Sequence, residues 1–139
     1  MKILLDSNVA LDAILKNREF HESASVVIGL SKGGVDLFVS ASAVTDIYYL
    51  VCRETKSKKI AMSLLKKLLE KVDVAAVSGS EIRKAVNLDW GDFEDAVQYA
   101  TGESIAVDYI VTRNKKDFVS SSLPVVNPDE LLALLNKSK

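Results

Sequence analysis

The residues of this sequence that could bind a ligand or take part in a reaction are acids that stand next to apolar runs. Asp6 directly follows the apolar run Ile3-Leu4-Leu5, so we expect it at the carboxyl end of a buried strand. In open α/β sheets, ligands bind at this edge. A charge there costs free energy unless a metal ion or a helix N-terminus satisfies it. The alternative is that Asp6 or Ser7 only caps the next helix, and Asp6 alone does not decide between the two.

A second acid, Asp46, interrupts the apolar segment Ser42–Leu50. Aspartate is a poor helix former and is unfavourable next to a hydrophobic core. Its presence allows a function for the carboxylate, but a solvated surface position explains Asp46 as well, and this feature alone does not establish a function.

A third acidic group opens a predicted helix. Asp92 and Asp95 are three residues apart, which predicts that they share a helical face and that Glu94 turns away. Helix capping explains Asp92 well. It explains Asp95 less well, because Asp95 runs directly into the apolar pair Ala96-Val97.

Asn114 and Asp117 follow the apolar run Tyr109–Thr112. They therefore lie at the carboxyl end of another predicted strand, at the same edge as Asp6 if the two strands are parallel. Turn chemistry alone also accounts for both residues.

Together these side chains offer oxygen ligands almost exclusively. Cys52 is the only cysteine and His21 the only histidine, which argues against a zinc or copper site. Carboxylates and amides suit Mg²⁺ or Mn²⁺. A converging acidic site with such ions activates water and stabilises charge during phosphodiester cleavage.

The elements that must position these residues alternate along the chain. Most of the predicted strands lack strict polar alternation, which is typical of a parallel sheet covered on both faces. The predicted strands are Lys2–Leu5, Asp36–Ser40, Val72–Val77, Tyr109–Thr112 and, more weakly, Pro124–Asn127. Helical spacing predicts helices over Ser7–Leu15, Ser42–Glu54, Ser57–Lys71, Ser80–Leu88, Asp92–Gly102 and Asp129–Lys137. This order predicts an α/β fold with a mostly parallel sheet.

Length and charge set further bounds. The 139 residues predict one domain spanning 1–139. Eighteen Lys and Arg against nineteen Asp and Glu give a net charge of −1, which excludes nucleic-acid binding through a global positive field but not through a local basic rim. No apolar run is long enough for a signal peptide or a membrane span, so we expect a cytoplasmic protein.

At this point the sequence resembles a PIN-domain ribonuclease of the VapC-type toxin group. The resemblance extends over nearly the whole chain and rests on the segments Leu4–Val9, Ser42–Tyr49, Asp92–Ala96 and Ile110–Phe118. It implies a three-layer α/β/α sandwich whose acids surround one or two Mg²⁺ or Mn²⁺ ions. It also implies endonucleolytic cleavage of RNA, a homodimer and, in toxin members, inhibition by an antitoxin protein.

By position, Asp6 resembles the family's first acid, Asp46 its second and Asp95 its third. The second acid is more often Glu in the wider family. Asn114 stands where many members have an acid, and Asp117 would complete the site. The resemblance therefore implies metal ligation by Asp6, Asp95, Asp46, Asp92 and Asp117, catalytic roles for Asp6, Asp46, Asp95, Asp117 and Asn114, and hydrogen bonding to the ligands by Ser7 and Thr112.

RNA approaching an acidic pocket needs basic groups at its rim. Arg113, Lys115 and Lys116 share the loop of Asn114 and are expected to hold phosphates, which positions RNA without reading its bases. The alternative function is a catalytically silent PIN-fold module that binds nucleic acid or protein. A phosphoacceptor domain is disfavoured because the third predicted strand ends in Ser78-Gly79-Ser80 and has no acid at its carboxyl end.

Overall fold

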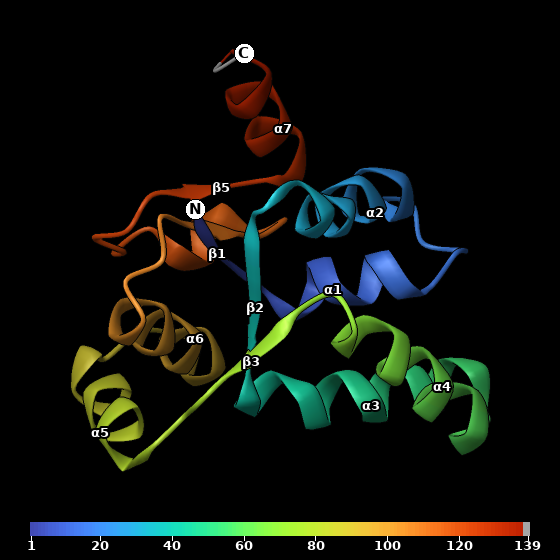
Figure 1. The fold of residues 1–139 in the computed structure, drawn as a ribbon. Coiled ribbons are helices and arrows are strands. Elements are labelled where there is room, and N and C mark those ends of the chain that lie inside the picture. Colours follow the sequence, from blue (N-terminus) through green and yellow to red (C-terminus); the bar gives the residue numbers. More distant parts are fainter. Residues whose placement is uncertain (138–139) are drawn as a thin grey trace.

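Five parallel strands form the central sheet of the protein in a computed structural model that describes residues 1–137 (Figure 1). Their order is β3-β2-β1-β4-β5. The strands are β1 (Lys2–Leu5), β2 (Asp36–Ser40), β3 (Asp73–Ala75), β4 (Tyr109–Val111) and β5 (Val125–Val126).

The register brings the ends of β1 and β4 level with each other. Leu5 pairs with Val111, and the Asp6 backbone N–H donates to the Val111 carbonyl at 2.9 Å. The residues that follow the two strands, Asp6 and Thr112, therefore start side by side. The predicted parallel pairing is confirmed.

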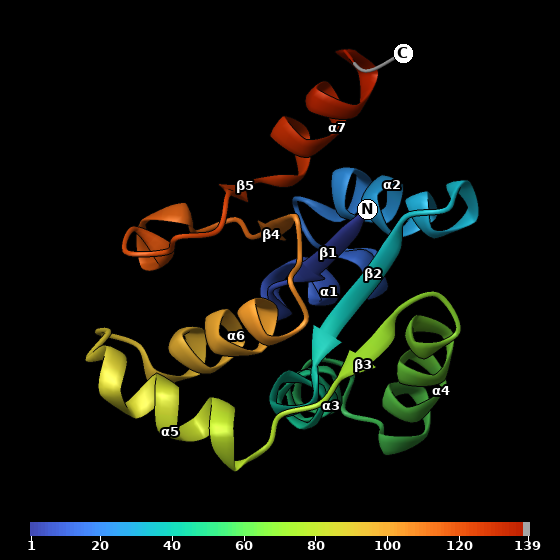
Figure 2. The same cartoon turned by 60° about the vertical axis from the view of Figure 1, so that its left-hand side comes forward.

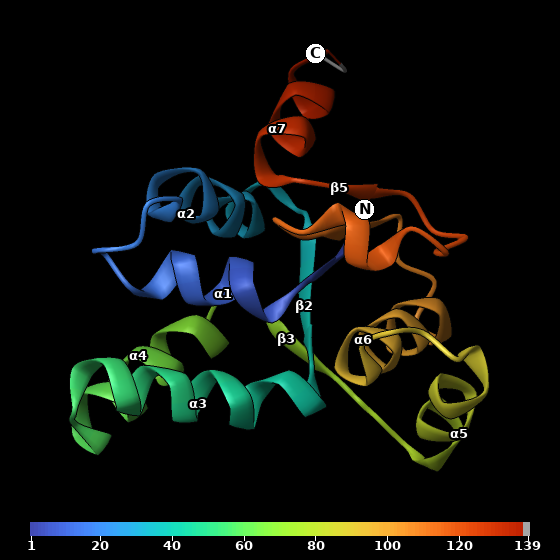
Figure 3. The same ribbon diagram turned by 180° about the vertical axis from the view of Figure 1, so that it is seen from behind.

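Helices cover both faces of this sheet. One face carries α1 (Ser7–Ile14), α2 (His21–Gly29), α3 (Ala41–Thr55), α4 (Lys58–Leu69) and α7 (Pro128–Lys137). The other face carries α6 (Phe93–Ser104), with α5 (Gly79–Leu88) packed beside it. Figures 2 and 3 show α5 and α6 on one side of the strands, and α1, α2 and α4 on the other. This is the predicted three-layer α/β/α sandwich.

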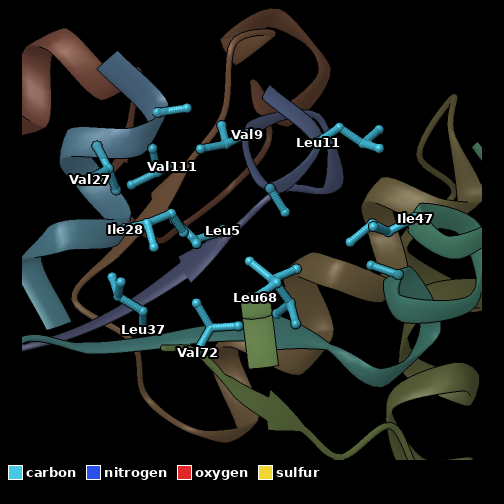
Figure 4. Close-up of a cluster of buried hydrophobic side chains, with 14 of the residues drawn as sticks. Leu5, Val9, Leu11, Val27, Ile28, Leu37, Ile47, Leu68, Val72 and Val111 are labelled. Atoms are coloured by element: carbon cyan, nitrogen blue, oxygen red, sulfur yellow. The ribbon is translucent and has the colours of Figure 1, made fainter. Parts of the chain in front are cut away.

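The pleat of β1 explains why its apolar run has no polar alternation. Ile3 and Leu5 belong to the core beneath α1–α4, part of which Figure 4 shows. Leu4 points to the opposite face, where it packs with Tyr99 of α6 and Ile110 of β4. A strand covered on both faces needs apolar residues at every position.

The predicted elements occur, with ends that differ by a few residues. The capped start of the helix after Ser78 is confirmed, because Ser78 and Glu81 form a reciprocal capping box. The sequence prediction missed α2, whose N-cap Phe20 makes no side-chain capping bond. Within residues 1–137, no helix is long and apolar enough to cross a bilayer.

Candidate functional site

The candidate site begins where β1 ends. Asp6 occupies the N-cap position of α1, but its side chain makes no capping bond and is only 5% exposed. Thr112 Oγ1 instead donates to Asp6 Oδ2 at 2.7 Å, and Gln98 Nε2 donates to Asp6 Oδ1 at 3.0 Å. The buried carboxylate is thus held from β4 and α6 rather than used to cap a helix.

The start of α6 supplies the next acids. Asp92 is the N-cap of α6, and its Oδ1 accepts a hydrogen bond from the Asp95 backbone N–H at 3.0 Å. Capping therefore accounts for Asp92, as the sequence allowed. The cap fixes the first turn, and the half-buried Asp95 directly precedes the buried stretch of α6, where its charge interacts with that of Asp6.

Asp95 is the acid of the site whose pKa is shifted most. Its pKa is raised from 3.8 to about 7, chiefly because its half-buried carboxylate has lost hydration. The negative charges that raise this pKa further belong, in decreasing order, to Asp6, Asp92, Asp117 and Glu94. Such mutual repulsion is typical of functional sites that bind a cation or a proton.

The expectation that Glu94 turns away is wrong. Ser7 Oγ lies 3.5 Å from Glu94 Oε1, within hydrogen-bonding distance. Partial burial raises the pKa of Glu94, and the charges of Asp46, Asp6 and Asp92 raise it further. The spacing argument fails because Asp92 has an extended backbone (φ −118°, ψ 115°) and lies outside the helix. Counting a helical face from Asp92 therefore misplaces the next residues.

The structure brings most of the other predicted acids to the same place. Asp46 is half-buried on α3, and its charge acts on Glu94 across the gap between α3 and α6. Asp117 lies in a short 3-10 helix, Lys115–Phe118, and its charge acts on Asp95. We call the resulting group the acidic cluster; it consists of Asp6, Asp46, Asp92, Glu94, Asp95 and Asp117.

Asn114 is connected to Asp6 through Thr112. Its backbone N–H donates to Thr112 Oγ1 at 3.0 Å. Asn114 borders a separate cavity of about 240 Å³, next to Phe20 and Arg113.

The acidic cluster has the chemistry of a site for a hard cation. All of its donors are carboxylates, and within residues 1–137 none of them forms an ion pair. No three His, Cys, Asp or Glu side chains among these residues are arranged to hold a metal ion. The type and the charge of the donors fit Mg²⁺ or Mn²⁺.

Two of the three residues of the predicted basic rim, Arg113 and Lys115, pair with acids outside the acidic cluster. Arg113 is engaged elsewhere, since its Nε lies 2.5 Å from Oδ2 of the buried Asp12 and its guanidinium lies 5.2 Å from the centre of the Phe20 ring. Lys115 pairs with Glu130 at 2.9 Å.

Lys116 is the rim residue that lies beside the acids. It borders a cavity of about 490 Å³ together with Asp92, Asp117 and Trp90. Two acids of the cluster, Asp92 and Asp117, therefore share this cavity with Lys116.

Sequence reasoning overlooked two buried polar residues, Asp12 and Gln98, each 1% exposed. A signal for Gln98 was available, because it follows Asp95 by three residues within an otherwise apolar stretch. Asp12 could not be recognised in the same way, because its partner Arg113 is distant in the sequence and only the tertiary structure shows their contact.

Comparisons with known proteins agree with this geometry. The model of the PIN domain matches residues 2–116. Ribonuclease VapC1 of Aquifex aeolicus (strain VF5) is 27% identical over 135 residues, which cover 93% of this chain and 92% of that protein.

Two solved structures share the fold. VapBC2 of Rickettsia felis, bound to a DNA fragment from its promoter, has a TM-score of 0.73 at 20% identity and covers 91% of this chain and 98% of that chain. A toxin–antitoxin complex of Klebsiella pneumoniae has a TM-score of 0.66 at 20% identity and covers 91% of this chain and 97% of that chain. At such identities, the structures establish the fold alone.

Proposed function

Because the chain belongs to the PIN domain family, we propose that it is a metal-dependent endoribonuclease that hydrolyses RNA phosphodiester bonds. The observation that carries this proposal is the acidic cluster at the carboxyl edge of β1 and β4. The similarity to a protein named Ribonuclease VapC1 supports RNA as the substrate.

Asp6 and Asp95 are the ligands we propose for Mg²⁺ or Mn²⁺, assisted by Asp46, Glu94 and Asp117. When bound, such an ion lowers the pKa of a bound water and offsets charge on the phosphate oxygens. The residues of the chain supply the rest: Thr112 and Gln98 orient Asp6, and the cap at Asp92 places Asp95 beside it. Asn114 supports this arrangement through its backbone N–H, which donates to Thr112 Oγ1.

Lys116 is the proposed contact to RNA phosphates, since it borders the opening onto Asp92 and Asp117. A phosphate contact of this kind positions the strand and carries no information about its bases.

We further propose that the protein is the toxin of a toxin–antitoxin pair, bound by an antitoxin protein. The support is the similarity of fold to the toxin–antitoxin complex of Klebsiella pneumoniae. Formation of a homodimer stays a prediction from the family resemblance.

The test is cleavage of structured and single-stranded RNAs by the purified protein with Mg²⁺, with Mn²⁺ and with EDTA. Asp6→Asn and Asp95→Asn remove one carboxylate each while keeping side-chain size, and both are expected to abolish cleavage. Asp36→Asn, an exposed aspartate at the start of β2, is the matched control and is expected to cut like the wild type. RNA cleavage that persists in EDTA or in Asp6→Asn contradicts the proposal.

The second candidate is a catalytically silent module that binds nucleic acid or protein. It is favoured by one observation, that no three acidic side chains within residues 1–137 are arranged to hold a metal ion. Calorimetric titration with Mn²⁺ separates the two candidates, because a silent module is expected to release no heat of metal binding.

A further inference from the structure

Gln98 is a buried polar residue that contacts the first acid of the site. It lies on α6, three residues after Asp95, and is 1% exposed. Its Nε2 donates to Asp6 Oδ1 at 3.0 Å. Its Oε1 is buried and has no hydrogen-bond donor among the residues that the structure describes.

Packing does not explain a glutamine at this position. Its neighbours Ala96, Val97, Tyr99 and Ala100 are buried, and an apolar side chain of similar size would fill the same space. A buried acceptor without a donor costs free energy. The hydrogen bond to Asp6 is the interaction that an apolar residue would lose.

The side chains that bond to the Asp6 carboxylate reach both of its oxygens. Gln98 donates to Oδ1, and Thr112 donates to Oδ2 at 2.7 Å. Ser7 Oγ also donates to Oδ1, at 3.4 Å, so donors on both oxygens fix the rotation of the carboxylate. A carboxylate has about four lone-pair positions, so Oδ2 keeps one for a further partner.

We propose that Gln98 is a positioning residue that, together with Thr112, fixes the Asp6 carboxylate in the orientation for binding a divalent cation. The inference rests on the proposed function and deepens it. A neutral amide suits this task better than a lysine or arginine, because it orients the carboxylate without cancelling the charge that attracts the cation.

Gln98→Met tests the proposal, because methionine keeps the length and the packing and removes the donor. Loss of a residue that orients a ligand typically weakens metal binding about 10- to 100-fold, and we expect the Mn²⁺ dissociation constant to rise by that factor. We expect the thermal midpoint of the metal-free variant to stay close to wild type. The lost donor to Asp6 lowers it, and removal of the unpartnered Oε1 raises it.

Thr101→Val is the matched control. Thr101 is fully buried on the same helix, but its Oγ1 donates to the Val97 carbonyl at 2.8 Å and not to the site. We expect this variant to bind Mn²⁺ like the wild type. A Gln98→Met protein that binds Mn²⁺ with wild-type affinity and melts earlier overturns the proposal, because that result describes a purely structural residue.

A second readout does not depend on a metal ion. In ¹⁵N NMR spectra of the metal-free protein, the Gln98 side-chain amide is expected to exchange slowly and to shift in Asp6→Asn and in Thr112→Val. Unchanged Gln98 signals in both variants overturn the proposal. If the wild type fails to bind Mn²⁺ while these shifts occur, the contact to Asp6 stands and the proposed metal-dependent function fails.

Discussion

Asp95 gives the sharpest quantitative prediction. Its pKa is about 7 in the folded protein and 3.8 ordinarily. Between these two pH values, the folded state therefore holds a proton that the unfolded state has released. An acid of this kind leaves stability unaffected below pH 3.8. It lowers stability increasingly as the pH rises towards 7, and by a constant amount above that value. Asp95→Asn removes the titrating charge and is expected to abolish this pH dependence.

The magnitude follows from the same values. A tenfold difference between the acid constants of the two states corresponds to about 1.4 kcal/mol, so the full effect is about 4 kcal/mol. Partial solvation of the carboxylate screens the repulsion, which reduces the effect to about 1–2 kcal/mol. Asparagine also loses a favourable interaction with the N-terminus of α6, about 0.5 kcal/mol. The net gain in the free energy of unfolding at pH 8 is about 1 kcal/mol, or roughly 3–5 °C in thermal midpoint.

The assay is thermal unfolding of wild type and Asp95→Asn in EDTA, at pH 4 and at pH 8. The variant is expected to melt later than wild type at pH 8 and at nearly the same temperature at pH 4. Asp36→Asn lies outside the acidic cluster and is expected to match wild type at both pH values. A difference between Asp95→Asn and wild type that is the same at both pH values, or a lower midpoint for the variant at pH 8, refutes the electrostatic account.

Two further predictions concern the basic residues. Arg113→Ala leaves the buried Asp12 carboxylate unpaired, and we expect the free energy of unfolding to fall by about 2 kcal/mol. Lys115→Ala breaks the exposed pair with Glu130, and we expect a loss of at most about 1 kcal/mol. Urea unfolding at pH 7 measures both, and equal losses in the two variants would contradict the assignment of Arg113 to the scaffold. Lys116→Ala is expected to weaken RNA binding to inactive Asp6→Asn protein and to reduce the salt dependence by about one phosphate contact. Lys59→Ala on α4 is the control, and a Lys116 variant with an unchanged salt slope would remove this residue from the RNA path.

Much of the fold could be predicted from the sequence because the central strands β1, β2 and β4 are covered on both faces. Runs such as Ile3-Leu4-Leu5 contain apolar residues without polar alternation, which predicts strands of a parallel sheet that is covered on both faces. The same runs place Asp6 and Thr112 at strand ends, and parallel pairing makes those ends neighbours. The helix α2 escaped prediction, because the residue at its start, Phe20, is not of a type that caps helices.

The chemistry of the site was also a property of the sequence. The sequence has one histidine and one cysteine, so a metal site built from it must rely on oxygen donors. Such donors prefer hard cations in any fold. Asp6, Asp46, Asp95 and Asp117 were identified from their positions relative to predicted strands and helices, and the structure brings them together with Asp92.

Which side chains face one another across different elements depends on the assembled fold. Periodicity gives the place of a residue on its own helix or strand, but its partners depend on how α6 packs against β1 and α3. That packing turns Glu94 towards Ser7 and brings Gln98 to Asp6. Arg113 is drawn away to Asp12, more than one hundred residues earlier in the chain, because a buried carboxylate needs a charged partner. Sequence spacing contains no record of such long-range pairings, so they emerge only when the layers are assembled.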